Sequence, residues 1–185
     1  MIDEVKQDAE HRMHGALDAL QRELAGIRTG RAAPALVERL HVDYYGASTP
    51  LNQLAGVSAP EARLLVIQPW DRGSIGAIEK AIMKSDLGLT PNSDGQVIRL
   101  AIPSLTEERR KALVKLVRTK VEEGKVAVRN VRRDAVDHIK ALAKERQIGE
   151  DDERRAMHDI DALTKHCTDD AERSGQAKEA EVLEV

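Results

Sequence analysis

The chain has 185 residues, a formal net charge of −3 and one cysteine, Cys167. This length fits one domain, or one domain with a smaller one attached, and a single cysteine excludes an internal disulfide and favours a cytosolic setting. Because aromatic residues make up only 2% of a chain that is 41% hydrophobic, the core is expected to consist of Leu, Ile, Val and Ala, which suits packed helices better than a large sandwich.

Neither a signal peptide nor a membrane-spanning helix is predicted. The opening stretch MIDEVKQDAEHRMHG is charged from its third residue and lacks the apolar run of a signal sequence. No segment approaches the roughly 20 apolar residues that are needed to cross a bilayer. The sequence therefore predicts a soluble, cytoplasmic protein.

The first periodic segment predicts a long amphipathic helix. Its apolar residues recur at steps of three or four, which places them on one helix face. They are Ile2, Val5, Ala9, Met13, Ala16, Leu20, Leu24 and Ile27. The helix is expected to end near the stretch TGRAAP, where Gly30 and then Pro34 intervene.

Two further helices are predicted in the second half of the chain. Ser104 has capping-box spacing to the acid three residues later, and Thr106 is a competing cap. The apolar stripe that follows reaches Gln147, with Gly149 as the C-terminal cap. The acidic stretch EDDE then begins a third helix, whose apolar seam includes Cys167. Three such amphipathic helices bury their apolar faces best in one antiparallel bundle.

The segment between these helices has a different character. RLHVDYYG alternates polar and apolar residues, RLLVIQP is a continuous apolar run, and residues 96–102 follow a turn, so each predicts a strand. GSIGAIEKAIMKSDLG predicts a helix that ends at Gly88. The fold class is therefore α+β, with a three-helix bundle of residues 1–30 and 105–185 and an inserted β/α/β domain of residues 31–104.

The two chain crossings between these domains are expected to form a hinge. They lie near residues 29–34 and 101–105, and two covalent connections with a modest interface leave domains free to move. The hinge candidates are Thr29, Gly30, Pro34, Pro103 and Ser104.

Charge is distributed very unevenly along the bundle. Residues 106–149 carry 13 Lys and Arg against 7 Asp and Glu, whereas residues 150–185 carry 5 against 12. On the second helix the cations follow one face, which contains a single acid. The members of this face are Lys111, Lys115, Arg118, Glu122, Lys125, Arg129 and Arg132. Arg129 and Arg132 each follow an apolar seam residue by one position, so both are expected to face solvent.

Two interpretations of this basic face stay open on charge alone. The cations could pair with the acidic third helix, as flanking charges of packed helices commonly do. Alternatively, they could bind the phosphates of folded RNA, an interpretation favoured by the arginines around residues 129–133, which suit bidentate phosphate contacts. The three aromatic residues all lie in the inserted segment, so stacking on single-stranded bases is not expected of this helix.

The sequence offers little that could carry catalysis. His11 and His14 lie three apart on a helix, but no further ligands are placed to complete a metal site. Cys167 follows His166 directly and lies on the apolar seam, so a buried core thiol is expected rather than a nucleophile. There is neither a P-loop nor a GxGxxG motif. A protein that is not an enzyme, with no metal and no cofactor of its own, is predicted.

Six sequence blocks along the whole chain resemble the bacterial ribosome recycling factor family. The blocks are IRTGRAAP, YYGASTPLNQLA, EKAIMKSDLGLTPNSDG, IPSLTEERRK, VAVRNVRRDA and EDDERR. The resemblance implies a three-helix bundle with an inserted β/α/β domain and a tRNA-like L shape overall. It also implies a monomeric translation factor that binds the large subunit of the 70S ribosome across the A and P sites after termination.

The same resemblance implies partners and contact residues. With elongation factor G, which binds and hydrolyses the GTP, such a factor splits the ribosome and releases mRNA and tRNA. The basic face of the bundle would contact 23S rRNA of the 50S subunit, and the inserted domain would meet elongation factor G and swing about the hinge. The residues implied in rRNA contact are Arg129 and Arg132, helped by Arg28, Arg31, Arg109, Arg110 and Arg133.

A second hypothesis from the residues is a helical scaffold or adaptor protein. Under this hypothesis the basic helix face recruits a protein partner rather than RNA. Association with purified ribosomes at low salt separates the two hypotheses.

Overall fold

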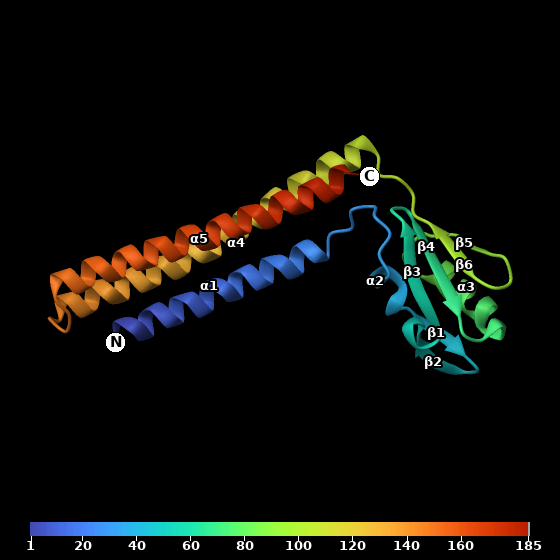
Figure 1. Ribbon diagram of the computed structural model, residues 1–185, viewed down its shortest axis with the longest axis horizontal. Helices are drawn as coiled ribbons and strands as arrows, with labels where there is room; N and C mark the ends of the chain where they lie inside the picture. Colours follow the sequence, from blue (N-terminus) through green and yellow to red (C-terminus); the bar gives the residue numbers. More distant parts are fainter. Residues whose placement is uncertain (185) are drawn as a thin grey trace. The chain divides into compact units, whose positions relative to one another are not determined.

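The computed structural model describes residues 1–184, which form two compact units (Figure 1). One unit combines Met1–Arg28 with Glu107–Glu184, and the other, the inserted unit, is Thr29–Thr106. The first unit is helical and the second contains the strands, which confirms the predicted α+β class.

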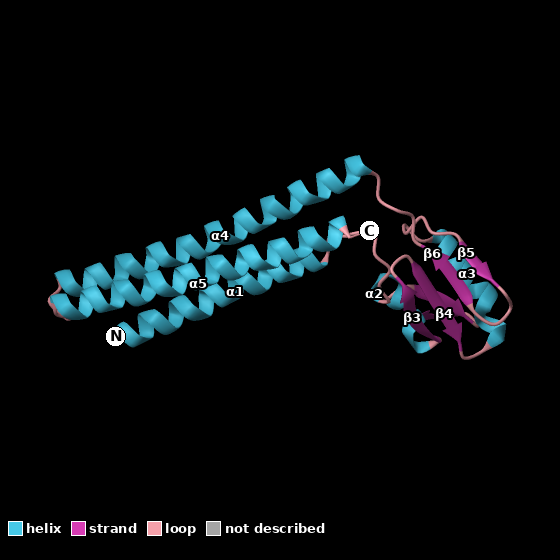
Figure 2. Ribbon diagram, turned by 45° about the horizontal axis from the view of Figure 1, so that its top comes forward, coloured by secondary structure: helices cyan, strands magenta, loops and turns pink. Residues whose placement is uncertain are grey.

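Three long helices form the bundle: α1 (Ile2–Ala25), α4 (Glu107–Lys144) and α5 (Glu150–Leu183) (Figure 2). Side-chain pairs fix their directions. Lys6 contacts Asp159 and Gln21 contacts Ser174, and both pairs are 153 residues apart in sequence, so α1 and α5 run parallel. α4 runs antiparallel to both helices, because Arg12 of α1 pairs with Asp134 of α4, whereas Glu23, further along α1, pairs with Lys120, nearer the start of α4.

The predicted apolar stripes meet in the bundle core. Met13 and Ile139 are fully buried in the larger of two clusters, which also contains Val128 and Cys167. Leu20, Leu24, Val117, Val121 and Ala171 form the second cluster. Val121 also marks a close approach of α4 to α5, because a Cβ added at Gly175 would lie 2.5 Å from its Cγ2 atom.

Several predicted helix ends are wrong. α1 ends at Ala25, with Gly26 as its cap, and not at Gly30. α4 ends at Lys144, and the residue that turns back with positive φ is Arg146. Gly149 has extended backbone and precedes α5 as its N-cap, so it is not a C-cap.

The inserted unit contains six strands in two sheets. β1 (His41–Tyr44) and β2 (Ala47–Pro50) form an antiparallel hairpin. The larger antiparallel sheet has the order β3-β4-β6-β5. Its strands are β3 (Ala55–Glu61), β4 (Leu64–Pro69), β5 (Pro91–Ser93) and β6 (Ile98–Ala101). The short helices are α2 (Ala35–Glu38), η1 (Leu51–Gln53), η2 (Arg72–Ser74) and α3 (Ile75–Lys84).

One face of the larger sheet is covered by α3. Leu65 and Ile67 of β4 alternate inward and are fully buried together with Ile78 and Ile82 of α3. The buried strand predicted at RLLVIQP is thus confirmed, as is the alternation of β1, where Val42 is buried between exposed neighbours. The helix in this unit ends at Lys84 and not at Gly88.

The turn between β5 and β6 is held by the carboxylate of Asp94. Its Oδ1 atom accepts hydrogen bonds from the backbone N–H groups of Gln96 and Val97, each at 2.9 Å. Its Oδ2 atom accepts a hydrogen bond from Nη1 of Arg99 at 3.0 Å. The backbone hydrogen bonds are the main cause that lowers the pKa of Asp94 to about 2, with the Arg99 contact adding to them. Each of these partners favours the charged carboxylate.

The turn is expected to lose this support in acid. Because the pKa of folded Asp94 is below the ordinary value of about 3.9, the carboxylate stabilises the turn at pH values above about 4, and this contribution is lost as the pH falls towards 2. A carbon-13 NMR titration of the Asp94 carboxyl group measures the midpoint, and a midpoint near the ordinary value contradicts the bonded turn. Arg99→Leu is expected to raise the midpoint only in part, since the backbone donors remain.

Candidate nucleic-acid interface

Three of the six cations on the basic face of α4 pair with acids of α5. Nε of Arg118 lies 2.9 Å from Oε1 of Glu179, and Nζ of Lys125 lies 2.6 Å from Oε2 of Glu172. A third pair joins Nε of Arg132 to Oδ1 of Asp161 at 2.7 Å. For these three cations the structure confirms the first of the two interpretations, in which the basic helix pairs with its acidic neighbour.

The three acids of α5 were not singled out from the sequence. They follow one another at intervals of 11 and 7 residues, and the three cations of α4 at intervals of 7. Both spacings keep residues on one helix face. Acids that recur on one face of α5, together with cations that recur on one face of α4, are the signal that could have revealed the pairing.

The expected exposure is correct for Arg129 and needs correction for Arg132. Arg129 is exposed, and its Nη1 lies 3.1 Å from Oε1 of Glu122 on the same helix. The Arg132 side chain is only 40% exposed, because it extends across to Asp161 instead of standing free in solvent. Arg133 is exposed and, among residues 1–184, forms no ion pair.

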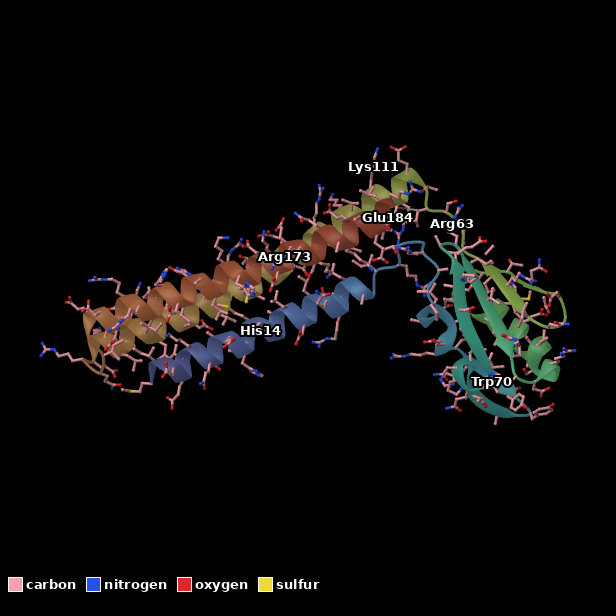
Figure 3. All side chains as sticks on the ribbon, viewed as in Figure 1. His14, Arg63, Trp70, Lys111, Arg173 and Glu184 are labelled. Atoms are coloured by element: carbon pink, nitrogen blue, oxygen red, sulfur yellow. The ribbon has the colours of Figure 1, made fainter. Side chains whose placement is uncertain are left out.

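The start of α4 contributes two further arginines. Arg109 is exposed, whereas Nε of Arg110 is buried and has no hydrogen-bond partner among the described residues. Arg110 lines a surface cavity of about 610 Å³ that α4 forms with the C-terminal end of α5, where Leu183 is exposed. Figure 3 marks Lys111, another lining residue, at this end of α4.

The remaining two arginines implied in rRNA contact are Arg28 and Arg31, which lie between α1 and α2. Arg28 is exposed and follows α1, and among the described residues it forms no ion pair. Arg31 is exposed in the first chain crossing. The seven predicted arginines therefore comprise a group on one exposed turn of α4, a pair at its start, and two that follow α1.

Arg118 keeps its positive charge in the pair with Glu179. The hydrogen bond with Glu179 raises the pKa of Arg118, with Coulomb attraction as the second cause. In the pair of Arg132 with Asp161 both side chains are partly exposed, and ion pairs at the surface are weak and are screened by salt.

Two of the candidate hinge residues, Gly30 and Ser104, lie against other residues of the inserted unit. Gly30 has φ +74°, and a Cβ added there would lie 2.8 Å from Cγ of Leu105 in the other crossing. Nη1 of Arg63 donates to Oγ of Ser104 at 2.6 Å, and Arg63 lies in the turn between β3 and β4. Thr29 is buried, Pro34 precedes α2, and Pro103 is exposed.

The described residues provide no arrangement for metal binding. Within residues 1–184, no group of three His, Cys, Asp or Glu side chains could hold a metal ion. Cys167 is fully buried, as predicted for a core thiol, and burial raises its pKa. His166 instead lies at the surface, 3.3 Å from Asp170. No helix in this part of the chain is long and apolar enough to span a bilayer.

Comparisons with known proteins agree along the whole chain. The sequence profile of the family described as Ribosome recycling factor matches residues 20–183. The ribosome-recycling factors of Thermomicrobium roseum and Halalkalibacterium halodurans are each 57% identical to it over 185 residues, covering 100% of both chains.

Solved structures give the same result. A solution structure of the ribosome recycling factor superposes with a TM-score of 0.75 at 42% identity, covering 100% of this chain and 98% of that one. A second, at 48% identity and a TM-score of 0.65, covers 99% of each chain. It represents the T. thermophilus ribosome recycling factor and the E. coli elongation factor G bound to the E. coli post-termination complex. With such relatives over its full length, and with the helical bundle and inserted sheet unit that they share, this chain belongs to the ribosome recycling factor family, whose members are translation factors and not enzymes.

Proposed function

We propose that this protein binds the large subunit of the post-termination ribosome across the A and P sites. With elongation factor G and GTP it splits the ribosome into subunits and releases mRNA and tRNA for a new round of translation. The protein acts in the cytoplasm as a monomer, and GTP is bound by its partner. Family membership supports this proposal, as does the relative bound together with elongation factor G to the post-termination complex.

The surface proposed to contact 23S rRNA is the exposed turn of α4 with Arg129, Arg132 and Arg133. The observation that carries it is the state of these three side chains: one without an ion pair among the described residues, and two in surface pairs with Glu122 and Asp161. Phosphate can displace such carboxylates, since arginine binds phosphate in a bidentate manner. Arg28, Arg31, Arg109 and Arg110 are proposed to add further contacts.

A role of Arg132 in rRNA binding can be separated from a role in helix packing by comparing substitutions of the two partners of its ion pair. Arg132→Ala removes both the ion pair with Asp161 and the rRNA contact. Asp161→Asn removes only the ion pair, and leaves the guanidinium available. We expect Arg132→Ala to weaken binding to purified 50S subunits by about tenfold, which corresponds to about 1.4 kcal/mol. Asp161→Asn is expected to bind as wild type or more tightly.

Sedimentation with 50S subunits over a range of salt concentrations measures the affinity of each variant and the dependence of that affinity on salt. The slope of log affinity against log salt is expected to fall by about one for Arg132→Ala, because one phosphate contact is lost. If both variants lose affinity equally, Arg132 acts through the helix pairing and not through rRNA. Circular dichroism of the two variants reports whether the helices are intact.

The hinge about which the inserted unit moves when it meets elongation factor G is proposed near the chain crossings at residues 29–34 and 101–105, at the ends of these crossings that adjoin the long helices. In support, both crossings consist of residues outside the long helices. The contacts of Gly30 with Leu105 and of Arg63 with Ser104 bind these crossings into the inserted unit. The free rotations are then left to the few residues between Ala25 and Thr29 and those just before Glu107.

A further inference from the structure

A large cavity lies in the inserted unit. It has a volume of about 660 Å³ and lies between α3 and the start of β1. Its rim carries Arg39, His41, Lys80 and Lys84, all exposed, and we call it the cationic groove. Its volume lies within the range of about 300–1,000 Å³ that is usual for binding sites.

The cations of this groove are not neutralised by the protein. Arg39, Lys80 and Lys84 form no ion pair among residues 1–184, in contrast to the paired cations of α4. The groove contains one carboxylate, that of Asp43, and its Oδ1 accepts the N–H of Gly46 at 2.9 Å in the hairpin turn. Residues 31–105 carry seven cationic and seven acidic side chains, so the excess of positive charge is local.

The floor of the cationic groove is apolar. Leu40, Ala77 and Ala81 line it and are half-buried, so their apolar surface stays partly in contact with water. Lys80 and Lys84 are four residues apart on α3 and stand on one wall, while Arg39 and His41 come from the opposite wall. An occupant that matches this arrangement has an apolar side chain flanked by negative charges.

These features favour a protein segment over a nucleic acid. Phosphodiesters match the cations but not an apolar floor, and the groove lining contains no Phe, Tyr or Trp side chain. A peptide that alternates carboxylate and aliphatic side chains matches both the rim and the floor. We propose that the cationic groove docks an acidic protein segment that places an aliphatic side chain between carboxylates. The surface is separate from the rRNA contact proposed above.

The proposal is tested with the full-length protein and two probes of equal net charge. One is a short synthetic peptide of repeated Glu-Leu-Glu units, and the other is a uridine oligonucleotide. Titration followed by amide NMR is expected to shift residues 39–43 and 77–85 with the peptide. The double variant Lys80→Glu, Lys84→Glu is expected to weaken peptide binding at least about tenfold, because it reverses both charges on one wall.

Matched variants separate the groove from general electrostatics. Lys140→Glu with Lys144→Glu makes the same charge change at the same spacing on α4, where both lysines are exposed and form no ion pair among the described residues. This control is expected to retain peptide binding. Lys80→Gln with Lys84→Gln avoids acidic residues at the C-terminal end of α3 and is expected to weaken binding to an intermediate degree.

Three results would overturn the proposal. One is an equal loss of affinity in the α4 control. Another is retained peptide binding in both folded groove variants. The third is an oligonucleotide that shifts the groove residues and binds as tightly as the peptide, which would assign the surface to nucleic acid instead.

Discussion

Replacing Gly175 with leucine is expected to destabilise the helical bundle by about 3 kcal/mol or more. A Cβ at this position would lie 2.5 Å from Cγ2 of Val121, at a buried point where α5 closely approaches α4. Valine in a helix has essentially one χ1 rotamer and cannot turn away, so the two helices must separate locally. Urea unfolding followed by circular dichroism at the helix minimum measures the loss of free energy.

A matched glycine distinguishes crowding from helix propensity. Gly15 lies in the middle of α1, and a Cβ there would meet nothing within 4 Å. Gly15→Ala is expected to stabilise the bundle by about 0.5–1 kcal/mol, because alanine is the better helix former. If Gly175→Leu leaves the stability of the bundle unchanged, the close approach of α4 and α5 at Val121 is incorrect.

Replacing Gly30 with valine is expected to destabilise the inserted unit by about 3 kcal/mol. Two effects add: a β-branched residue with φ +74° costs about 1–2 kcal/mol, and its Cβ would lie 2.8 Å from Cγ of Leu105, which is overpacking. Cγ of Leu105 is the branch point near the backbone, so it cannot move aside without moving the second crossing. Hydrogen exchange of the β4 and β6 amides reports the stability of this unit separately from that of the bundle.

Gly88→Val is the control for backbone strain alone. Gly88 has φ +64°, and nothing lies within 4 Å of a Cβ added there. This variant is expected to destabilise the inserted unit only by the cost of a β-branched residue at positive φ, about 1–2 kcal/mol. Equal losses in Gly30→Val and Gly88→Val would show that the Leu105 contact does not hold the two crossings together.

The helices and their buried faces could be predicted because their apolar residues recur at steps of three or four over the whole length of each helix. Val128 and Val131 fix the phase of α4, and both are buried in the structure. The same argument placed Cys167 in the core, where it lies. Helix ends depend on single residues, and here Arg146 adopts the positive φ that was expected of Gly149.

The pairing of charges could not be derived from one helix at a time. The phase of α4 shows which side Arg132 occupies, but its contact with Asp161 depends on how far α5 is displaced along α4. That displacement is fixed by packing, including the close approach of Gly175 to Val121. A pattern within one helix contains no information about its neighbour's displacement.

β3 escaped prediction for a different reason. Its sequence AGVSAPE has only a weak apolar alternation, with Val57 between two alanines, and it contains Pro60, which normally argues against a strand. β3 lies at the edge of the four-stranded sheet, and Pro60 falls where its pairing register with β4 shifts, a position at which a missing N–H donor can be tolerated. Pairing with β4 therefore makes this segment a strand, not its own propensity.

The division of the bundle into two stretches of sequence also determines the order in which the protein can fold during its synthesis. α1 leaves the ribosome first, but residues 29–106 must be made before any residue of α4 appears. At about 5–20 residues per second, this delay is on the order of 10 s. Most of the stability of a helix in a protein comes from the packing of its apolar face, and the apolar face of α1 has no partner until α4 is made. The inserted unit, whose sequence is continuous, can finish folding within that interval, so the segment synthesised first is among the last to reach its native packing.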